Sequence, residues 1–114
     1  TYAGEYQMGY MVWGIDYNDP YAMLSLMVSN SGNIPTFWEN EKYDELIAQS
    51  AVEMDEAKRV ELYKEAENLL FNEGCALCPI VNESANTYRY SYMKNMATMP
   101  FTTTGLKYVY TSGR

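Results

Sequence analysis

The chain has 114 residues, of which 47% are apolar and 20% charged, so one folded domain with one core is expected rather than a disordered chain. Fifteen acidic residues stand against eight basic ones, which gives a formal charge of −7, and no cluster of Lys or Arg interrupts the acidic background. We therefore expect no nucleic acid partner, because phosphate binding requires a basic surface.

The sequence contains no His, which excludes catalytic triads built on His and removes the commonest transition-metal ligand. Cys75 and Cys78 form a Cys-x-x-Cys pair, but a zinc site would need further Cys or His ligands, and the chain has none. Redox pairs of this kind normally precede a helix, whereas this pair follows one. No metal and no cofactor are expected, and both cysteines are interpreted as small apolar residues of a core strand.

The chain begins at Thr1 without an initiating Met or a leader peptide, and we interpret it as trimmed. Its longest early uncharged stretch, residues 20–38, is interrupted by Ser, Asn, Gly and Pro, so no membrane-spanning helix is predicted.

The first elements in chain order are a strand and a helix. Residues 8–15 are almost wholly apolar, which predicts a strand buried on both faces. Asp19 and Pro20 indicate a helix start, since Asp can cap free backbone N–H groups and Pro is tolerated in the first turn. This helix is expected to reach Val28, and residues 29–35 are predicted to be a loop.

Two longer helices are predicted next, the first capped by Asn40 and the second running from about Asp55 to a stop at Gly74. Their inward faces are recognised by apolar side chains at helical spacing. The first carries Tyr43, Leu46, Ile47 and Ala51, with Glu41, Lys42, Asp44 and Glu45 facing water, and the second carries Leu62, Tyr63, Ala66, Leu69 and Leu70.

Short strands are predicted at residues 77–81, 88–92 and 106–110, with an irregular stretch at 93–105. The order strand, three helices and two or three strands indicates an α/β (mixed α+β) class, with helices packed on a small mixed sheet. The first strand has no obvious partner, so its neighbours are expected from sequence upstream of this chain.

Four segments carry a resemblance to a known family. They are residues 13–20 (Trp-Gly-Ile-Asp-Tyr-Asn-Asp-Pro), Tyr43-Asp44, residues 55–67 and Cys78-Pro79-Ile80. In this order they resemble the carboxy-terminal region of the oligopeptide- and dipeptide-binding proteins of bacterial ABC importers, extracytoplasmic solute-binding protein family 5, over nearly the whole chain. The resemblance implies that residues 1–114 are a single C-terminal domain fragment, part of the C-terminal lobe of a two-lobe periplasmic-binding-protein-like fold.

The resemblance implies a binding protein and not an enzyme. Such proteins enclose an extended oligopeptide between two lobes and deliver it to the permease subunits of an ABC transporter. They lie outside the cytoplasm, in the periplasm or on the outer face of the cell membrane, often as lipoproteins, and here the anchor would lie outside the chain. A dipeptide or a nickel complex is an alternative solute within the same family.

The resemblance also implies a ligand-binding site at Trp13, Gly14, Asp16 and Tyr17. Asp16 matches the carboxylate that pairs with the free α-amino group of the ligand in oligopeptide binders. Alternatively, Asp16 accepts backbone N–H groups in the turn toward Pro20. Trp13 and Tyr17 would line the same cleft, although each aromatic side chain could belong to the core instead.

Two positions depart from the family pattern. Tyr10 stands where some enteric relatives have a basic residue that helps to hold the ligand's carboxylate. Gly14 stands where some relatives have a Cys, so the disulfide formed there is absent.

Two functions of other classes remain as alternatives. Asp16 and Asp19 could act as the paired acids of a hydrolase, although Asp19 already has a capping role. The unpaired first strand could instead form a homodimer. The charged residues Arg59, Asp44 and Glu67 are interpreted as scaffold.

Overall fold

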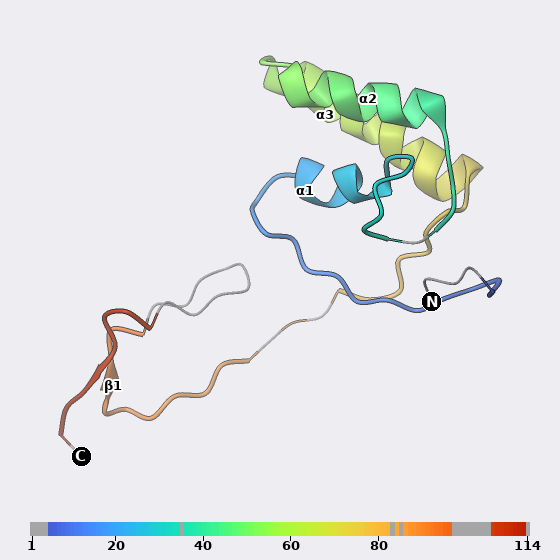
Figure 1. Cartoon of the computed structure of the whole chain (residues 1–114). Helices are drawn as coiled ribbons and strands as arrows, with labels where there is room; N and C mark the ends of the chain where they lie inside the picture. The colour runs from blue at the N-terminus through green and yellow to red at the C-terminus, as the bar shows by residue number, and fades with distance from the viewer. Residues whose placement is uncertain (1–4, 35, 83, 85, 97–105, 114) are drawn as a thin grey trace.

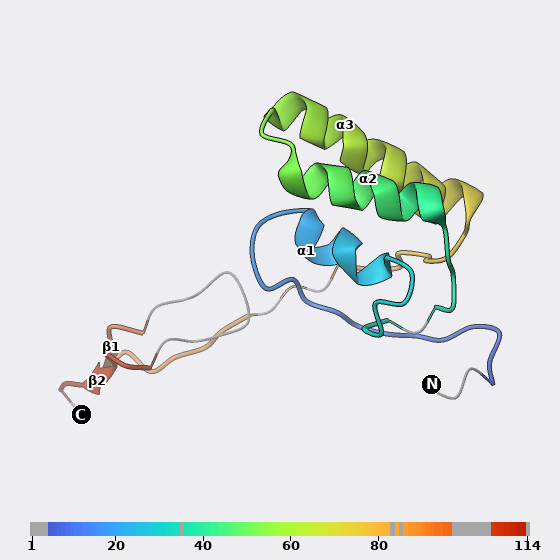
Figure 2. The ribbon, with the colours of Figure 1, turned by 45° about the horizontal axis from the view of Figure 1, so that its top comes forward.

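The computed structural model describes residues 5–34, 36–82, 84, 86–96 and 106–113. Three helices pack together, and two short strands lie apart from them (Figures 1 and 2). The elements are α1 (Tyr21–Leu24), the 3₁₀ turn η1 (Ser25–Met27), α2 (Glu41–Val52), α3 (Glu56–Glu67), the π-helical turn η2 (Asn68–Glu73), β1 (Met93–Lys94) and β2 (Tyr110–Thr111). The predicted mixture of helices and a small sheet is confirmed.

Helix α2 begins where its cap was predicted. The Asn40 side-chain oxygen accepts the backbone N–H of Tyr43 at 3.0 Å, which satisfies one of the free donors of the first turn. Tyr43, Leu46 and Ile47 are buried as expected. The predicted inward position of Ala51 is wrong, because the last buried position of the stripe is Ser50, whose hydroxyl donates to the carbonyl of Ile47 at 2.8 Å.

The expectation that Asp44 faces water is also wrong. Its side chain is only half-exposed, and its Oδ1 accepts the backbone N–H of Ser29 at 2.9 Å. Asn40 is tied to the same loop residue, because its backbone N–H donates to the Ser29 hydroxyl at 3.3 Å. The start of α2 is thereby fixed to the loop that follows α1.

Helix α3 is capped by Asp55, whose Oδ1 accepts the backbone N–H groups of Ala57 at 3.0 Å and Lys58 at 3.3 Å. It continues through η2 to Gly74, as the pattern of residues 55–74 predicts. The left-handed residue at its end is Cys75, with a φ of 47°, and not Gly74. The backbone N–H of Ala76 then closes the turn by donating to the carbonyl of Leu70 at 3.0 Å.

The core lies where α1, α2, α3 and η2 meet. Its buried apolar side chains are Leu24, Met27, Tyr43, Leu46, Ile47, Tyr63, Ala66, Leu69 and Leu70. The Tyr43 side chain crosses this core, and its hydroxyl donates to the carbonyl of Leu24 at 2.7 Å. Burial raises the pKa of Tyr43, so the hydroxyl stays protonated and available as a donor.

The strands were predicted poorly. In the described part of the chain the one β pairing joins β1 and β2, which are antiparallel, with Met93 opposite Thr111. Residues 8–15 and 77–81 form no strand. The strands predicted at residues 88–92 and 106–110 begin a few residues later, as β1 and β2. A strand needs a neighbour for its N–H and C=O groups, and these apolar segments have none among the described residues. Most of the irregular stretch predicted at 93–105 lies outside the described residues.

The helices therefore pack on one another and not on a sheet, contrary to expectation (Figure 2). The radius of gyration is 18.7 Å, well above the roughly 13 Å expected of a compact domain of this length. The elements α1, η1, α2, α3 and η2 together form what we call the helical unit. Apolar side chains outside this unit remain exposed, among them Met8, Tyr10, Ile80 and Tyr88. Among the described helices, none has the length and apolar character needed to cross a membrane.

We predict that Gly74→Ala destabilises the helical unit. A Cβ at this position would lie 2.6 Å from Trp38 Nε1 and 2.9 Å from the carbonyl oxygen of Leu69, so side chain or backbone must shift. Overpacking of this kind costs about 1–3 kcal/mol. Urea unfolding followed by circular dichroism measures the loss.

The matched control at the next position is Cys75→Gly, which is expected to stabilise the chain by about 1 kcal/mol because Gly tolerates the left-handed conformation. Equal unfolding midpoints for the wild type and Gly74→Ala would contradict the packing of Trp38 over Gly74.

Candidate functional site

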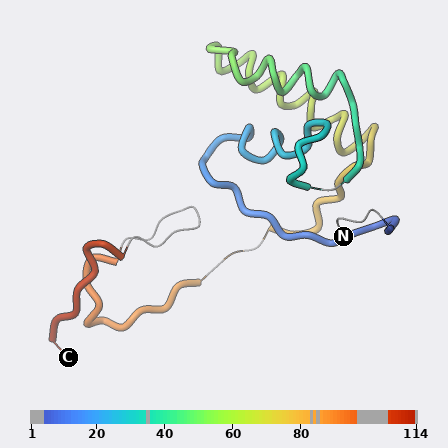
Figure 3. Tube along the Cα trace, viewed as in Figure 1, coloured from blue at the N-terminus to red at the C-terminus, as the bar shows by residue number. Residues whose placement is uncertain are grey.

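The four predicted site residues lie in the segment that leads into α1, which Figure 3 shows as the blue tube passing beneath the helices. Trp13 and Tyr17 are 43% and 49% exposed, so the alternative that either belongs to the core is wrong. Gly14 and Asp16 are exposed as well. All four residues are therefore open to solvent, within five consecutive positions.

Asp16 forms no hydrogen bond or ion pair with any described residue. The alternative that it accepts backbone N–H groups in the turn toward Pro20 is therefore not what the structure shows. That role falls to Asp19, whose Oδ1 accepts the backbone N–H of Tyr21 at 2.8 Å. The predicted cap at Asp19 is thus confirmed, and the carboxylate of Asp16 is left without a partner in the described part of the chain.

Asp19 has two more partners, both on α3. Its Oδ2 lies 3.0 Å from a guanidinium nitrogen of Arg59, and the hydroxyl of Tyr63 donates to its Oδ1 at 3.0 Å. Only 20% of the Asp19 side chain is exposed, so this ion pair is shielded from water better than most surface pairs. We call Asp19, Arg59 and Tyr63 the Asp19 cluster.

The electrostatics of the cluster favour an ionised Asp19. The hydrogen bond from the backbone of Tyr21 lowers the pKa of Asp19, and the Tyr63 hydroxyl and the Arg59 charge lower it further, while partial burial opposes them. Burial and the bond to Asp19 raise the pKa of Tyr63, which keeps its hydroxyl a donor. The Arg59 guanidinium also lies 5.9 Å from the centre of the Tyr63 ring.

The Asp19 cluster was not predicted from the sequence. Asp19 was interpreted as a cap or as one acid of a catalytic pair and Arg59 as scaffold, and no local sequence pattern connects residues 40 positions apart. One signal was available, because Arg59 and Tyr63 are four residues apart and therefore share a helix face. The inward position of Tyr63 indicated that Arg59 also points toward the rest of the chain.

A hydrolase that uses Asp16 and Asp19 is not supported by this geometry. An acid catalyst needs a raised pKa and access to substrate, whereas the pKa of Asp19 is lowered and both of its oxygens are engaged.

The interpretation of Cys75 and Cys78 as core residues is wrong. Both are free thiols and both are exposed. The segment that carries them was expected to be a buried strand, but it pairs with no other described segment, and its Ala76 and Leu77 are only partly buried against the helical core.

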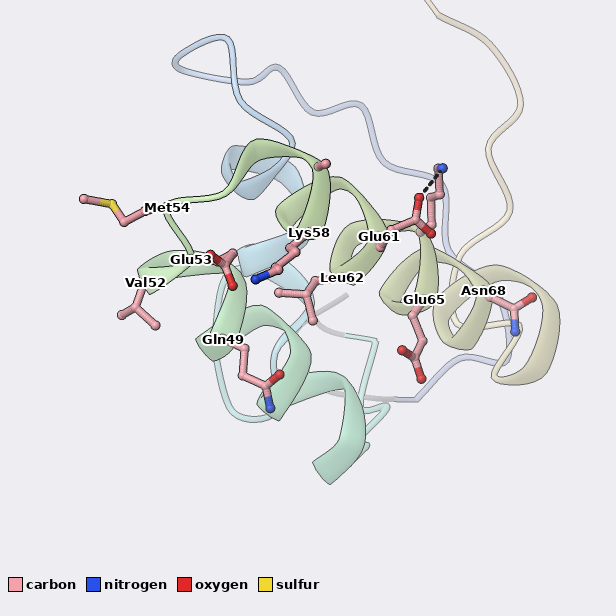
Figure 4. Close-up of a pocket in the computed structure, with 11 residues that line it drawn as sticks. Gln49, Val52, Glu53, Met54, Lys58, Glu61, Leu62, Glu65 and Asn68 are labelled. Carbon is pink, nitrogen blue, oxygen red and sulfur yellow. Dashed lines mark hydrogen bonds and ion pairs between the residues drawn. The ribbon is translucent and has the colours of Figure 1, made fainter.

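An open groove lies between the C-terminal part of α2 and the outer side of α3, away from the predicted site (Figure 4). Leu62 points into its centre, while Val52 and Met54 project from its edge. None of the four predicted site residues lines it. Its lining residues are Gln49, Val52, Glu53, Met54, Ala57, Lys58, Glu61, Leu62, Lys64, Glu65 and Asn68.

No family model matches the chain, but known proteins are similar to part of it. The oligopeptide-binding protein OppA of Bacillus subtilis is 44% identical over 70 residues, which are 60% of this chain and 13% of that protein. The periplasmic oligopeptide-binding protein OppA of Salmonella typhimurium is 32% identical over 77 residues, 68% of this chain and 14% of that protein.

A third relative is YgiS of Escherichia coli, named a probable deoxycholate-binding periplasmic protein, which is 33% identical over 78 residues, 68% of this chain and 14% of that protein. The chain therefore spans only 13 to 14% of the length of these three relatives. The three alignments cover 60 to 68% of the chain, less than the nearly complete coverage expected from its motifs.

We predict that Asp19→Asn destabilises the chain by about 1–2 kcal/mol at neutral pH, because a charged cap and an ion pair are lost together. The folded-state pKa of Asp19 lies below its ordinary value of 3.8. The stabilisation is therefore complete above the ordinary value and disappears as the pH falls through the lower folded-state pKa. Urea unfolding at pH 7 and at several values below pH 4 measures this difference.

Asp16→Asn is the matched control, because it removes an exposed carboxylate from the same segment without breaking a bond in the described chain. It should leave the unfolding midpoint unchanged at each pH. An Asp19→Asn deficit that persists undiminished in strong acid would contradict the assigned pKa shift.

Proposed function

Because this chain is related to the oligopeptide- and dipeptide-binding solute-binding proteins, as its motifs predicted, we propose that it supplies one wall of a peptide-binding cleft. The chain would be part of the C-terminal lobe of a longer protein, since its relatives are about five times its length. The role is one of binding and delivery rather than catalysis.

The observation that carries this proposal is the exposed carboxylate of Asp16, which has no partner among the described residues and lies in the same five-residue segment as the exposed side chains of Trp13 and Tyr17. A carboxylate without an internal partner can accept a charge-assisted hydrogen bond from the ammonium group of a peptide. The flat aromatic faces would cover apolar parts of the ligand without demanding one side chain. Recognition of this kind depends on the peptide terminus and main chain, so it tolerates varied sequences.

The other parts of the cleft would come from the rest of the protein. This arrangement explains why the segment at residues 8–17 exposes so much apolar surface here, because a second lobe and further strands would cover it on closure. We further propose that the closed complex is delivered to the permease subunits of an ABC importer outside the cytoplasm. Two of the relatives are named periplasmic proteins, which supports that location.

A different solute is the second candidate. YgiS is named for deoxycholate, a steroid carboxylate, and DppE of Bacillus subtilis, named a dipeptide-binding protein, is 41% identical over 58 residues, 51% of this chain and 11% of that protein. The charge of Asp16 favours a ligand with an ammonium group over an anion. A peptide or dipeptide therefore fits this segment better than a steroid acid does.

We predict that the complete protein binds peptides with a free amine and that Asp16→Asn weakens this binding. The loss of one charge-assisted hydrogen bond corresponds to about 10- to 150-fold in Kd. Acetylating the peptide amine should weaken binding to the wild type to a similar degree and should have little further effect on the variant. Isothermal titration calorimetry with a panel of peptides of two to eight residues measures these affinities.

Glu39→Gln is a suitable control, because it removes an exposed carboxylate outside the proposed site. Wild-type affinity that is indifferent to acetylation would remove Asp16 from its proposed role. Binding of deoxycholate but of no peptide would favour the second candidate.

A further inference from the structure

The position of Asp16 depends on a residue that does not contact the proposed ligand. The backbone N–H of Asp19 donates to the carbonyl of Tyr17 at 3.0 Å, which closes a tight turn directly after Asp16. Asp16 itself has no partner within the described chain, so its own interactions do not hold it in place. The direction of its side chain therefore follows from how the turn at residues 17–19 is held.

Asp19 holds that turn through three contacts from two helices. The backbone N–H of Tyr21 in α1 binds it at 2.8 Å, and Arg59 and Tyr63 of α3 bind it at 3.0 Å each. Helix α3 is fixed in turn to α2 and to the core, since Tyr63 is 5% exposed. The turn is thus connected to the buried core of the helices through a shielded ion pair.

We propose that Arg59 and Tyr63 are positioning residues, which act through Asp19 to hold the Asp16 carboxylate in the geometry that receives the ligand's ammonium group. This inference rests on the proposed function. It adds to the proposed site two residues of α3, which lie outside the motif at residues 13–17. A binding group that is fixed before the ligand arrives avoids the entropic cost of ordering it on binding.

Removing the charge of Arg59 gives different results if Arg59 orients Asp16 and if it acts on the ligand only through its charge. Removing the positive charge of Arg59 leaves Asp19 uncompensated and makes the segment more negative. By Coulomb attraction alone, a more negative segment would bind an ammonium group more tightly. Positioning predicts the opposite, because the turn that orients Asp16 is loosened. The sign of the affinity change therefore distinguishes the two effects.

The test measures peptide affinity of the complete protein by calorimetry, with each peptide in free-amine and N-acetylated form. Arg59→Met and Tyr63→Phe are the test variants, and Tyr63→Phe removes only one hydroxyl, so it preserves the core and the net charge. Both should weaken binding of the free-amine peptide by about three- to tenfold while affecting the acetylated peptide little, as expected when a binding group loses its support. Arg59→Lys keeps the charge and should recover part of the affinity.

Lys64→Met is the matched control, since Lys64 also lies on α3 and, among the described residues, its ammonium group pairs only with its helix neighbour Glu61, at 2.7 Å. It should leave both affinities unchanged. Hydrogen exchange at the amide of Tyr21 should accelerate in Arg59→Met and Tyr63→Phe but not in Lys64→Met, because that amide is bonded to Asp19.

The outcomes separate the two proposals. Wild-type protein that prefers free-amine peptides, combined with test variants that keep this preference in full, would overturn the positioning role alone. Tighter binding by Arg59→Met would also overturn it, in favour of the charge effect. Wild-type protein without any affinity for peptides would overturn the proposed function and this inference with it.

Discussion

The ion pair and hydrogen bonds of Asp19 connect the segment before α1 to α3, and they hold the start of α1 against the other helices. With α1 held in place, Leu24 and Met27 enter the core, and the carbonyl of Leu24 meets the hydroxyl of Tyr43 at 2.7 Å. A short helix of four residues has little stability of its own, because helix nucleation is unfavourable. Most of the stability of α1 must therefore come from its contacts with α2 and α3.

How well each element could be predicted depended on where its hydrogen bonds go. A helix satisfies its bonds within a few residues, so the caps at Asn40 and Asp55 could be recognised from the sequence alone. A strand depends on a partner elsewhere in the chain or outside it. The apolar residues 8–15 have the composition of a buried strand, yet no described segment pairs with them, and composition could not reveal that.

The same distinction applies to the candidate site. Asp16 was predicted as a ligand-binding residue because it belongs to a contiguous motif, and the structure leaves it exposed. The partnership of Asp19 with Arg59 could not be predicted, because it joins a loop to a helix 40 residues later, and only the packing of α1 against α3 brings them together. Gly74 was correctly expected near the end of a helix, but the close approach of Trp38 explains it better than a left-handed backbone does.

The carboxylates of Asp16 and Asp19 differ in whether a positive charge within the described structure compensates them. Placing a charge where water is partly excluded is costly unless a partner compensates it, and Arg59 serves Asp19 in that way. No Lys or Arg precedes Lys42 in the sequence. In the proposed site the carboxylate of Asp16 is therefore left to pair with a ligand, and residues 5–20 carry no Lys or Arg that could hold a peptide's carboxylate. Under the proposed function, such a wall would recognise one end of a peptide and leave its length to be set by other parts of the cleft.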